Sequence, residues 1–329
     1  MGTKVAILGC GRWAGFHAWY QSEKLGNEVL VWGREGDPLF EDFAATHKNG
    51  YLTLNDEVKF ESDLKAALDF SKYVIVAISA QAMRDLSANI ARHNPKNKIF
   101  VLCMKGIDCE TCERLSVILR EKIDETNKIC VWVGPGHVQE FTEDKPNVMV
   151  IDGDDKGARD EVYEAFASDL IRIYRGNDLI GTEFGAASKN VLGIAAGMLD
   201  GAGLPSLKGP LMARGMLECA RLIVAEGGNA NSAYGIAHVG DFEATLFSGN
   251  SHNRKYGEEF VKSKECLEDF NKRIGTAEGV PTSKAFFKLA EKHKIEMPIA
   301  GAVYKILHEG ADIKEVFDDL MREVKGEEF

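Results

Sequence analysis

A single lysine, Lys189, stands inside a long run of small and apolar residues that extends from Gly181 to Gly201. Residues four apart lie on one face of a helix, and the glycines that follow this spacing around the lysine are Gly181, Gly185, Gly193, Gly197 and Gly201. Glycine costs a helix roughly 1 kcal/mol relative to alanine, so the spacing predicts that another helix or a ligand approaches this face closely. Two interpretations stay open: a catalytic ammonium in a groove, because lysine is seldom buried without a partner or a function, or a core helix whose lysine reaches solvent.

Further groups suited to catalysis follow two apolar runs that predict strands. Lys105 and Gly106 follow the run Ile99–Met104, and the turn Gly134–Gly136 follows Ile129–Val133. Ligands of open parallel sheets bind at the carboxyl ends of the strands. The pattern therefore predicts that Lys105 and the turn meet a ligand. A loop lysine exposed on the surface is the alternative.

A glycine-rich turn lies between the first predicted strand, Lys4–Leu8, and a helical pattern that runs to about Lys24. A second strand pattern, Glu28–Trp32, follows, and this order is typical of a dinucleotide-binding unit. In such a unit Gly9 permits the tight turn, Gly11 lets the backbone approach a pyrophosphate, and Ala14 keeps helix and strand close. The free N–H groups of the helix would then face phosphate.

The residues after the second strand bear on the choice of cofactor. Dinucleotide-binding units that take NAD usually carry an acidic residue at this point, which binds the ribose hydroxyls. Here the strand is followed by Gly33 and Arg34. Arg34 could face a 2′-phosphate, which favours NADP, while Glu35 leaves NAD open.

Strand and helix patterns alternate through the first half of the chain. Strands are predicted at Lys4–Leu8, Glu28–Trp32, Tyr73–Ile78, Ile99–Met104, Ile129–Val133, Val148–Ile151 and Ile171–Tyr174. Further helices are predicted to end at Leu68 and to span Ala80–His93, Glu110–Glu125 and Ala158–Phe166. The alternation predicts an α/β fold with a doubly wound, mostly parallel sheet of the Rossmann type.

From Asp178 onward only helical periodicity is found, as in Leu211–Val224, Phe286–Ala290 and Val303–Leu307. We therefore expect two domains. Residues 1–177 would form the dinucleotide-binding domain, and residues 178–329 an all-helical domain that binds the substrate.

Composition narrows the class of protein. The chain has 329 residues, of which 45% are hydrophobic, and a net charge of −11, so nucleic acid and anionic membrane surfaces are not expected as partners. The N-terminus leads into a strand without a signal segment, and Lys189 with Asn190 argues against a membrane span.

The cysteines bear on the compartment and on metal binding. Seven cysteines, an odd number, are scattered along the chain, which is typical of a reducing compartment; the cytoplasm is therefore expected. Cys109 and Cys112 have C-x-x-C spacing, but two further ligands are missing nearby, so no metal is expected. A redox role for this pair is the alternative.

Taken together, these motifs resemble the NAD(P)-dependent glycerol-3-phosphate dehydrogenase family along nearly the whole chain. The segments that carry the resemblance are Gly9–Ala14, Lys105-Gly106, Gly134-Pro135 with Glu140, Ser188–Val191, Ala196–Gly201, Gly240-Asp241, Ser251–Lys255, Glu278-Gly279 and Glu296–Ile299. The resemblance implies reversible reduction of dihydroxyacetone phosphate to sn-glycerol 3-phosphate by hydride transfer from NAD(P)H, which supplies glycerophospholipid synthesis.

The resemblance also implies roles for individual residues. Lys189 would give and take the proton at the substrate oxygen, with Lys105 as a second catalytic group. The substrate would be bound by Lys105, Lys189, Asn190, Asp241, Ser251, His252, Asn253 and Arg254. The cofactor would be bound by Gly9, Gly11, Arg12, Trp13, Ala14, Arg34, Lys105, Gly134, Gly136, Arg254 and Glu278. Ketone reduction needs a proton at the developing alkoxide, and an ammonium can supply both the proton and the charge.

The sequence departs from the family pattern at His252, where the family usually has an arginine that grips the substrate phosphate. An arginine offers a permanent charge and a bidentate fork that histidine lacks. Ser79-Ala80 and the segment Gly203–Gly209 also differ from the pattern. Two alternatives therefore stay open: a related dehydrogenase for another small hydroxy compound, and a non-catalytic NAD(P)-binding sensor, which would not need both lysines. Glycine-rich helices and apolar C-terminal faces permit a homodimer.

Overall fold

The computed structural model describes residues 2–247, 249 and 251–322, which form two compact units. The first unit, the sheet unit, comprises the residues up to Lys105 together with Glu113–Glu183. The second, the helical unit, comprises Gly106–Cys112 and the residues from Phe184 onward. The segment Gly106–Cys112 therefore leaves the sheet unit for the helical unit and then returns.

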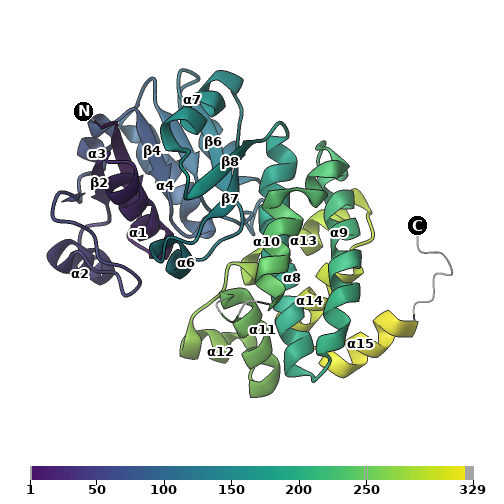
Figure 1. Cartoon of the computed structure of the whole chain (residues 1–329). Coiled ribbons are helices and arrows are strands. Elements are labelled where there is room, and N and C mark those ends of the chain that lie inside the picture. Colours follow the sequence, from purple (N-terminus) through teal and green to yellow (C-terminus); the bar gives the residue numbers. More distant parts are fainter. Residues whose placement is uncertain (1, 248, 250, 323–329) are drawn as a thin grey trace. The chain divides into compact units, whose positions relative to one another are not determined.

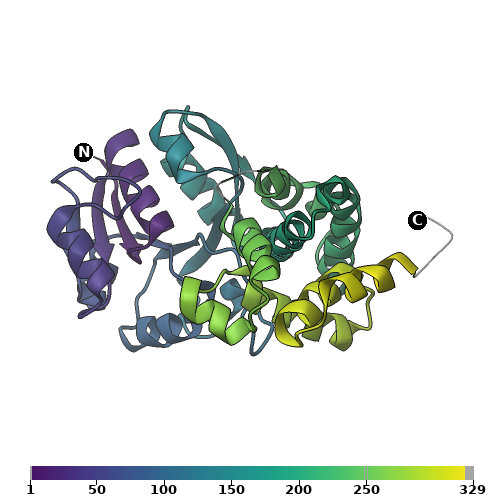
Figure 2. The ribbon, with the colours of Figure 1, turned by 90° about the horizontal axis from the view of Figure 1, so that it is seen from below.

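The sheet unit is built on one sheet of eight strands in the order β3-β2-β1-β4-β5-β6-β7-β8. The strands are β1 (Lys4–Leu8), β2 (Glu28–Trp32), β3 (Lys59–Glu61), β4 (Tyr73–Val76), β5 (Ile99–Leu102), β6 (Lys128–Val133), β7 (Asn147–Gly153) and β8 (Ile171–Arg175). Figure 2 follows this order in colour, from purple and blue strands to teal ones. All neighbours pair in parallel except β6 and β7, which are antiparallel. The predicted Rossmann-type sheet is therefore confirmed.

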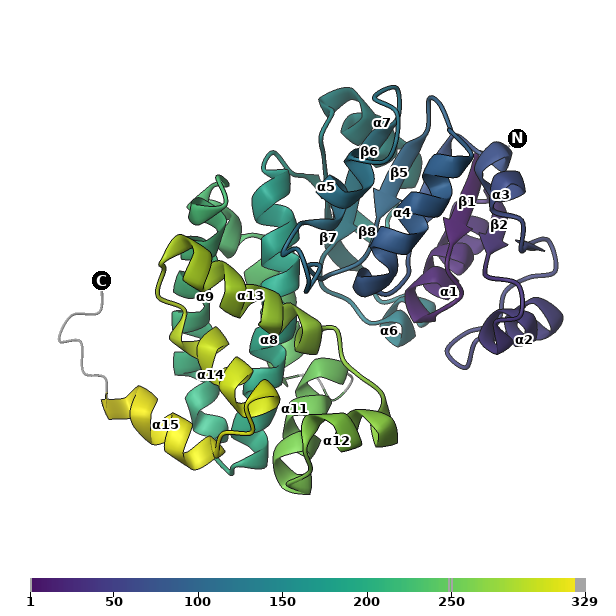
Figure 3. The same cartoon turned by 180° about the vertical axis from the view of Figure 1, so that it is seen from behind.

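Helices cover both faces of this sheet, with α7 in front in Figure 1 and α4 in front in Figure 3. The helices of the sheet unit are α1 (Arg12–Trp19), α2 (Pro38–Thr46), α3 (Leu64–Phe70), α4 (Met83–Arg92), α5 (Leu115–Arg120), α6 (Val138–Thr142) and α7 (Lys156–Phe166). A π-helical turn, Tyr20–Lys24, extends α1, so the first helix ends where the sequence predicts.

The helix predicted over Glu110–Glu125 is wrong in extent, because α5 covers only Leu115–Arg120. Two local features prevent the segment before Leu115 from forming a helix. The carboxylate of Asp108 accepts hydrogen bonds from the backbone N–H groups of Glu110 and Thr111, and Cys112 has a left-handed φ of 63°. The elements α2, β3 and α6 were not predicted.

A buried aromatic cluster holds several helices of the sheet unit against the sheet. Phe16 of α1 packs against Phe141 of α6 with ring centroids 4.9 Å apart, and Trp132 of β6 packs against Phe166 of α7 at 5.7 Å. Tyr20 joins the two pairs and donates a 2.7 Å hydrogen bond to the Phe166 carbonyl. The cluster thereby fixes α1 and β6, the elements next to the two glycine turns.

In the helical unit, every regular element among the described residues is a helix, as expected. The helices are α8 (Leu179–Gly201), which begins in the sheet unit, α9 (Lys208–Ala225), α10 (Asp241–Phe247), α11 (His252–Ser263), α12 (Leu267–Ile274), α13 (Gly279–His293), α14 (Pro298–His308) and α15 (Ile313–Arg322). Figure 3 shows α13 and α14, which pack on each other and on α9. No helix in the described part of the chain is long and apolar enough to cross a membrane.

The glycine spacing of α8 is explained by a helix rather than a ligand. A Cβ atom at Gly197 would lie 1.9 Å from the Arg254 carbonyl oxygen, and one at Gly201 would lie 2.8 Å from that of Glu258. Both carbonyls belong to α11. Glycine is therefore needed on α8 because the backbone of α11 occupies the space of a side chain.

Candidate active site

The first glycine turn follows β1 and leads into α1. Gly9 has a φ of 128°, and a Cβ there would lie 2.3 Å from the Ala77 carbonyl oxygen, so only glycine fits. A Cβ at Gly11 would meet no atom within 4 Å. Since packing does not require glycine at position 11, the open space above it suits the close approach of a ligand to the N–H groups of α1.

The loop after α2 reaches this turn, and sequence reasoning missed it. Asn49 donates a 3.4 Å hydrogen bond from Nδ2 to the Gly11 carbonyl oxygen, and the ring of Tyr51 lies 4.9 Å from the Arg12 guanidinium. Arg12 also donates from Nη2 to Gln139 Oε1 at 2.6 Å. These contacts fix the guanidinium at the start of α1. They join segments far apart in the chain, so no local pattern indicates them.

Lys105 lies among residues of the two glycine turns. Its Nζ donates a 2.7 Å hydrogen bond to the Gly134 carbonyl oxygen and stands 5.2 Å from the ring centroid of Trp13. Gly136, with a φ of 130°, has no room for a Cβ because Phe141 lies 2.4 Å from that position. The structure thus brings Lys105, Trp13 and Gly134 together, while Ala14 is buried in α1.

Arg34, the residue expected to distinguish the cofactors, lies largely in solvent. Its side chain is 79% exposed and lies 3.5 Å from Asp37. Asp37 itself caps α2 by accepting a hydrogen bond from the Leu39 N–H. A surface ion pair of this kind is weak, so the guanidinium can turn toward a phosphate at little cost.

In the helical unit, Lys189 forms a buried pair with Asp241. The Lys189 Nζ lies 3.3 Å from Asp241 Oδ1, and the two side chains are only 12% and 6% exposed. Thr245 completes the cluster, with its Oγ1 3.5 Å from the same Nζ and donating to the Asp241 carbonyl oxygen. This arrangement favours a held ammonium over a lysine that reaches solvent. Thr245 was missed, although its place four residues after Asp241 puts both on one helix face.

Two asparagines link α8 to α11 and α13 beside this cluster. Asn253 donates from Nδ2 to Asn190 Oδ1 at 3.0 Å, and its own Oδ1 accepts from the Gly279 N–H at 3.0 Å. A Cβ at Gly193 would lie 2.8 Å from Thr245 and 3.3 Å from Asn253. The small residue at position 193 therefore lets Thr245 and Asn253 stand close to the helix that carries Lys189.

The remaining predicted residues of the helical unit lie at the starts of helices. Ser251 caps α11 by accepting the Arg254 N–H at 3.3 Å, and His252 is exposed. Glu278 directly precedes α13. Arg254 pairs through Nη1 with Asp200 at 2.8 Å and with Glu258 at 2.9 Å. Its guanidinium thus stabilises the contact of α8 with α11.

Two buried histidines are poor proton donors at neutral pH. Burial lowers the pKa of His238 to about 4, although its Nδ1 lies 3.1 Å from the Gly185 carbonyl oxygen. Burial and, to a lesser degree, the charge of Lys105 lower the pKa of His17 to about 3. No group of three or more possible metal ligands occurs within the described ranges. Neither histidine is therefore a proton donor at neutral pH, whereas the Lys189 Nζ lies in the buried cluster with Asp241.

Comparisons with known proteins agree with this arrangement. The family model of the NAD-dependent glycerol-3-phosphate dehydrogenase N-terminus matches residues 4–158, and that of the C-terminus matches residues 178–318. A glycerol-3-phosphate dehydrogenase [NAD(P)+] of a Thermoanaerobacter species is 34% identical over 99% of this chain and 98% of its own. One of Listeria innocua is 34% identical over 97% and 96%. The crystal structure of glycerol-3-phosphate dehydrogenase from Coxiella burnetii is similar with a TM-score of 0.90 and 26% identity, over 98% of this chain and 99% of that one.

Proposed function

The chain belongs to the NAD-dependent glycerol-3-phosphate dehydrogenase family, and we propose that it interconverts dihydroxyacetone phosphate and sn-glycerol 3-phosphate with NAD(P)H. The observation that carries the proposal is the buried cluster of Lys189, Asp241 and Thr245. A buried ammonium held by a carboxylate suits a reaction in which negative charge develops on an oxygen.

Lys189 is the proton donor in this proposal. As the carbonyl carbon is reduced, its oxygen becomes an alkoxide, and the Lys189 Nζ gives it a proton while the C–O double bond becomes single. The carboxylate of Asp241, 3.3 Å from Nζ, holds the ammonium in place. In the reverse direction the neutral amine takes the proton from the hydroxyl.

Asn190 and Asn253 would position the substrate. Their side-chain amides are fixed by the hydrogen bond between them and by the Gly279 N–H, which donates to Asn253, so each amide has a defined direction. Ser251 and His252, at the start of α11, would meet the phosphate. Arg254 would act indirectly, because its guanidinium already pairs with two carboxylates.

The residues of the sheet unit suit a dinucleotide. The open space above Gly11 and the first turn of α1 would take the pyrophosphate, flanked by Arg12 and Trp13. NAD(P)H supplies the hydride when bound. Lys105, held by the Gly134 carbonyl oxygen, would keep a positive charge at the carboxyl end of β5 for the reacting groups. Arg34 would face a 2′-phosphate, and for that reason we favour NADP over NAD.

The direct test is an assay in which purified protein is given dihydroxyacetone phosphate with NADPH or NADH. Oxidation of the cofactor is measured by its absorbance. We expect turnover with both cofactors and a lower KM for NADPH. Turnover with an unphosphorylated ketone in place of dihydroxyacetone phosphate would favour a related dehydrogenase. Cofactor binding without turnover of any carbonyl compound would favour a sensor.

His252→Arg tests how the substrate phosphate is bound. Arginine adds a permanent charge and a second donor at the exposed start of α11, so we expect the KM for dihydroxyacetone phosphate to fall roughly three- to tenfold. Steady-state kinetics measures it, with His93→Arg, an exposed histidine of the sheet unit, as the matched control. An unchanged KM for the His252 variant would mean that the phosphate binds away from this position.

Two further expectations concern the state of the protein in the cell. We propose that it acts in the cytoplasm, because its seven cysteines are free thiols of the kind that persist in a reducing compartment.

We also propose a homodimer, for which the partly exposed apolar helices of the C-terminal part offer surface. Sedimentation velocity of the full chain would test the second expectation.

A further inference from the structure

Along the described ranges the chain crosses between its two compact units three times, and both proposed catalytic lysines lie close to a crossing. The chain leaves the sheet unit after Lys105, returns at Glu113, and leaves again after Glu183, inside α8. Lys189 lies six residues after Glu183 on the same helix. Six residues of helix span about 9 Å, so the direction of α8 at Glu183 determines where Lys189 lies.

The Glu183 side chain, only 6% exposed, joins α8 to the start of α5. Its Oε2 accepts hydrogen bonds from Arg114 Nη1 at 2.7 Å and from Ser116 Oγ at 2.5 Å. Its Oε1 accepts the Ser116 N–H at 3.0 Å, one of the N–H groups that the start of a helix leaves without an intrahelical partner. Arg114 and Ser116 follow the crossing at Glu113. One buried carboxylate therefore binds together the chain beside two of the crossings.

A second buried carboxylate, that of Asp152 in β7, holds the same end of α8. Its Oδ2 accepts hydrogen bonds from the Asp178 N–H and from Thr182 Oγ1, both at 2.9 Å. A Cβ atom at Gly176 would lie 2.3 Å from this oxygen, so the chain needs glycine there. The first turns of α8 are thus bound by both β7 and α5. Loss of the contacts with α5 would leave the helix docked through Asp152 but with less control of its direction.

We propose that Glu183 is a positioning residue for Lys189. Through its hydrogen bonds with Arg114 and Ser116, it sets the direction of α8 and thereby the place of the Lys189 ammonium. A turn of about 6° at Glu183 would move a point about 9 Å along the helix by about 1 Å. A misplacement of this size can lower a rate about 10²-fold. The inference rests on the proposed role of Lys189 as proton donor.

Glu183→Gln tests the role of the carboxylate, because glutamine keeps the size of the side chain but loses its charge and one acceptor oxygen. We expect kcat for reduction of dihydroxyacetone phosphate to fall about 10- to 100-fold. The KM for dihydroxyacetone phosphate and the Kd for NADPH should each change less than about threefold, because Glu183 is remote from the residues proposed to bind them. An unchanged kcat would overturn the proposal.

A double variant separates positioning of Lys189 from every other effect of Glu183. If Glu183 acts through the ammonium, its substitution costs little once the ammonium is gone. The single-turnover rate of Glu183→Gln with Lys189→Met should therefore lie within about threefold of that of Lys189→Met alone. Equal losses with and without Lys189 would overturn this proposal and leave the proposed function intact. Wild-type turnover in Lys189→Met alone would overturn both.

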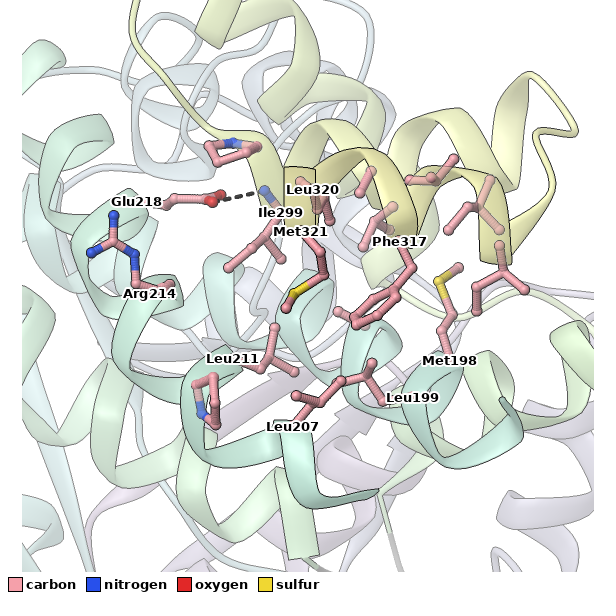
Figure 4. A pocket seen from close by; sticks show the side chains of 18 of the residues that line it. Met198, Leu199, Leu207, Leu211, Arg214, Glu218, Ile299, Phe317, Leu320 and Met321 are labelled. Atoms are coloured by element: carbon pink, nitrogen blue, oxygen red, sulfur yellow. Dashed lines mark hydrogen bonds between the residues drawn. The ribbon is translucent and has the colours of Figure 1, made fainter. Parts of the chain in front are cut away.

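Glu218→Gln is the matched control. The Glu218 side chain, on α9, is also buried and binds the start of another helix, α14, by accepting from the Ile299 N–H at 2.7 Å and the Ala300 N–H at 3.1 Å. Figure 4 shows this carboxylate directed at Ile299. Neither α9 nor α14 carries a proposed site residue. Both variants should unfold at lower urea concentration, and only Glu183→Gln should lose turnover. An equal loss of kcat in Glu218→Gln would overturn the proposal, because it would trace the effect to lower stability.

Ser116→Ala provides a milder variant if Glu183→Gln does not fold. It removes the Ser116 Oγ donor and leaves the Arg114 and Ser116 N–H contacts with Glu183. We expect kcat to fall about three- to tenfold, and this loss should vanish in the Lys189→Met background. A loss that persists there would overturn the proposal in the same way.

Discussion

Lys189→Met is expected to lower kcat for reduction of dihydroxyacetone phosphate by at least about 10³-fold, since proton donation contributes roughly 10²- to 10⁴-fold and a positioned charge contributes more. Methionine keeps the length of the side chain but carries neither charge nor proton. NADPH binding should be nearly unchanged, because Lys189 is not among the residues expected to bind the dinucleotide, most of which lie in the sheet unit. Single-turnover kinetics and a fluorescence titration with NADPH measure the two effects separately.

Lys189→Arg separates the two contributions of the ammonium. Arginine keeps a positive charge for the developing alkoxide, but its guanidinium does not give up a proton in proteins. We therefore expect kcat to fall roughly 10²-fold, less than in Lys189→Met. If the two variants were equally impaired, charge alone would contribute little and proton transfer would explain the loss.

The matched control is Lys208→Met, which removes another buried lysine of the helical unit. Lys208 is 10% exposed and pairs with Asp200 at 2.7 Å, so its loss also removes a buried ammonium from beside a carboxylate, which keeps Arg254 as its other partner. Both variants should unfold at lower urea concentration than the parent protein. Only Lys189→Met should lose turnover. Wild-type turnover in Lys189→Met would remove Lys189 from the reaction and leave it a structural role.

The parts of the fold that could be predicted depend on local sequence. The strand, glycine turn and helix from Lys4 to Lys24 are specified by neighbouring residues, and the conformation of Gly9 agrees with its predicted turn. The direction of a strand within a sheet could not be predicted in this way, because an apolar run shows the same pattern in either direction. The antiparallel pairing of β6 with β7 was therefore not evident from the sequence.

The candidate site likewise contains some residues that the sequence indicated and others that it did not. Lys189 stood out because a buried lysine among glycines is unusual, and Asp241 stood out because of its motif. Tyr51 and Asn49 reach the glycine turn from a loop whose path depends on tertiary contacts, so spacing in the sequence gives no information about them.

Gly197→Ala is expected to lower the free energy of unfolding by about 3 kcal/mol or more, at the upper end of overpacking effects. The new methyl group would lie 1.9 Å from the Arg254 carbonyl oxygen and 2.8 Å from the Glu258 nitrogen. Both are backbone atoms of α11, so no side-chain rotation relieves the clash and the helix itself must move. Gly201→Ala, whose nearest contact is 2.8 Å, should show a smaller loss. Urea unfolding measures both.

Gly209→Ala is the control for helix propensity. Gly209 also lies in a helix, α9, but a Cβ there would meet no atom within 4 Å. Alanine should therefore stabilise the protein by up to about 1 kcal/mol. If glycine-to-alanine substitution lowers the free energy of unfolding in α8 and raises it in α9, the α8 glycines are required by close packing. A stabilised Gly197→Ala protein would contradict the crossing of α8 and α11.

Gly197→Ala should also affect the reaction, because α11 carries Asn253 and is capped by Ser251. Moving α11 away from α8 would lengthen the 3.0 Å hydrogen bond between Asn253 and Asn190, next to Lys189. A misplacement of about 1 Å can cost 10²-fold in rate, so we expect a loss of this order in kcat/KM for dihydroxyacetone phosphate. NADPH affinity should not change. The repeated glycine would then serve catalysis through packing, because it lets the helix with the proton donor lie against the helix that positions the substrate.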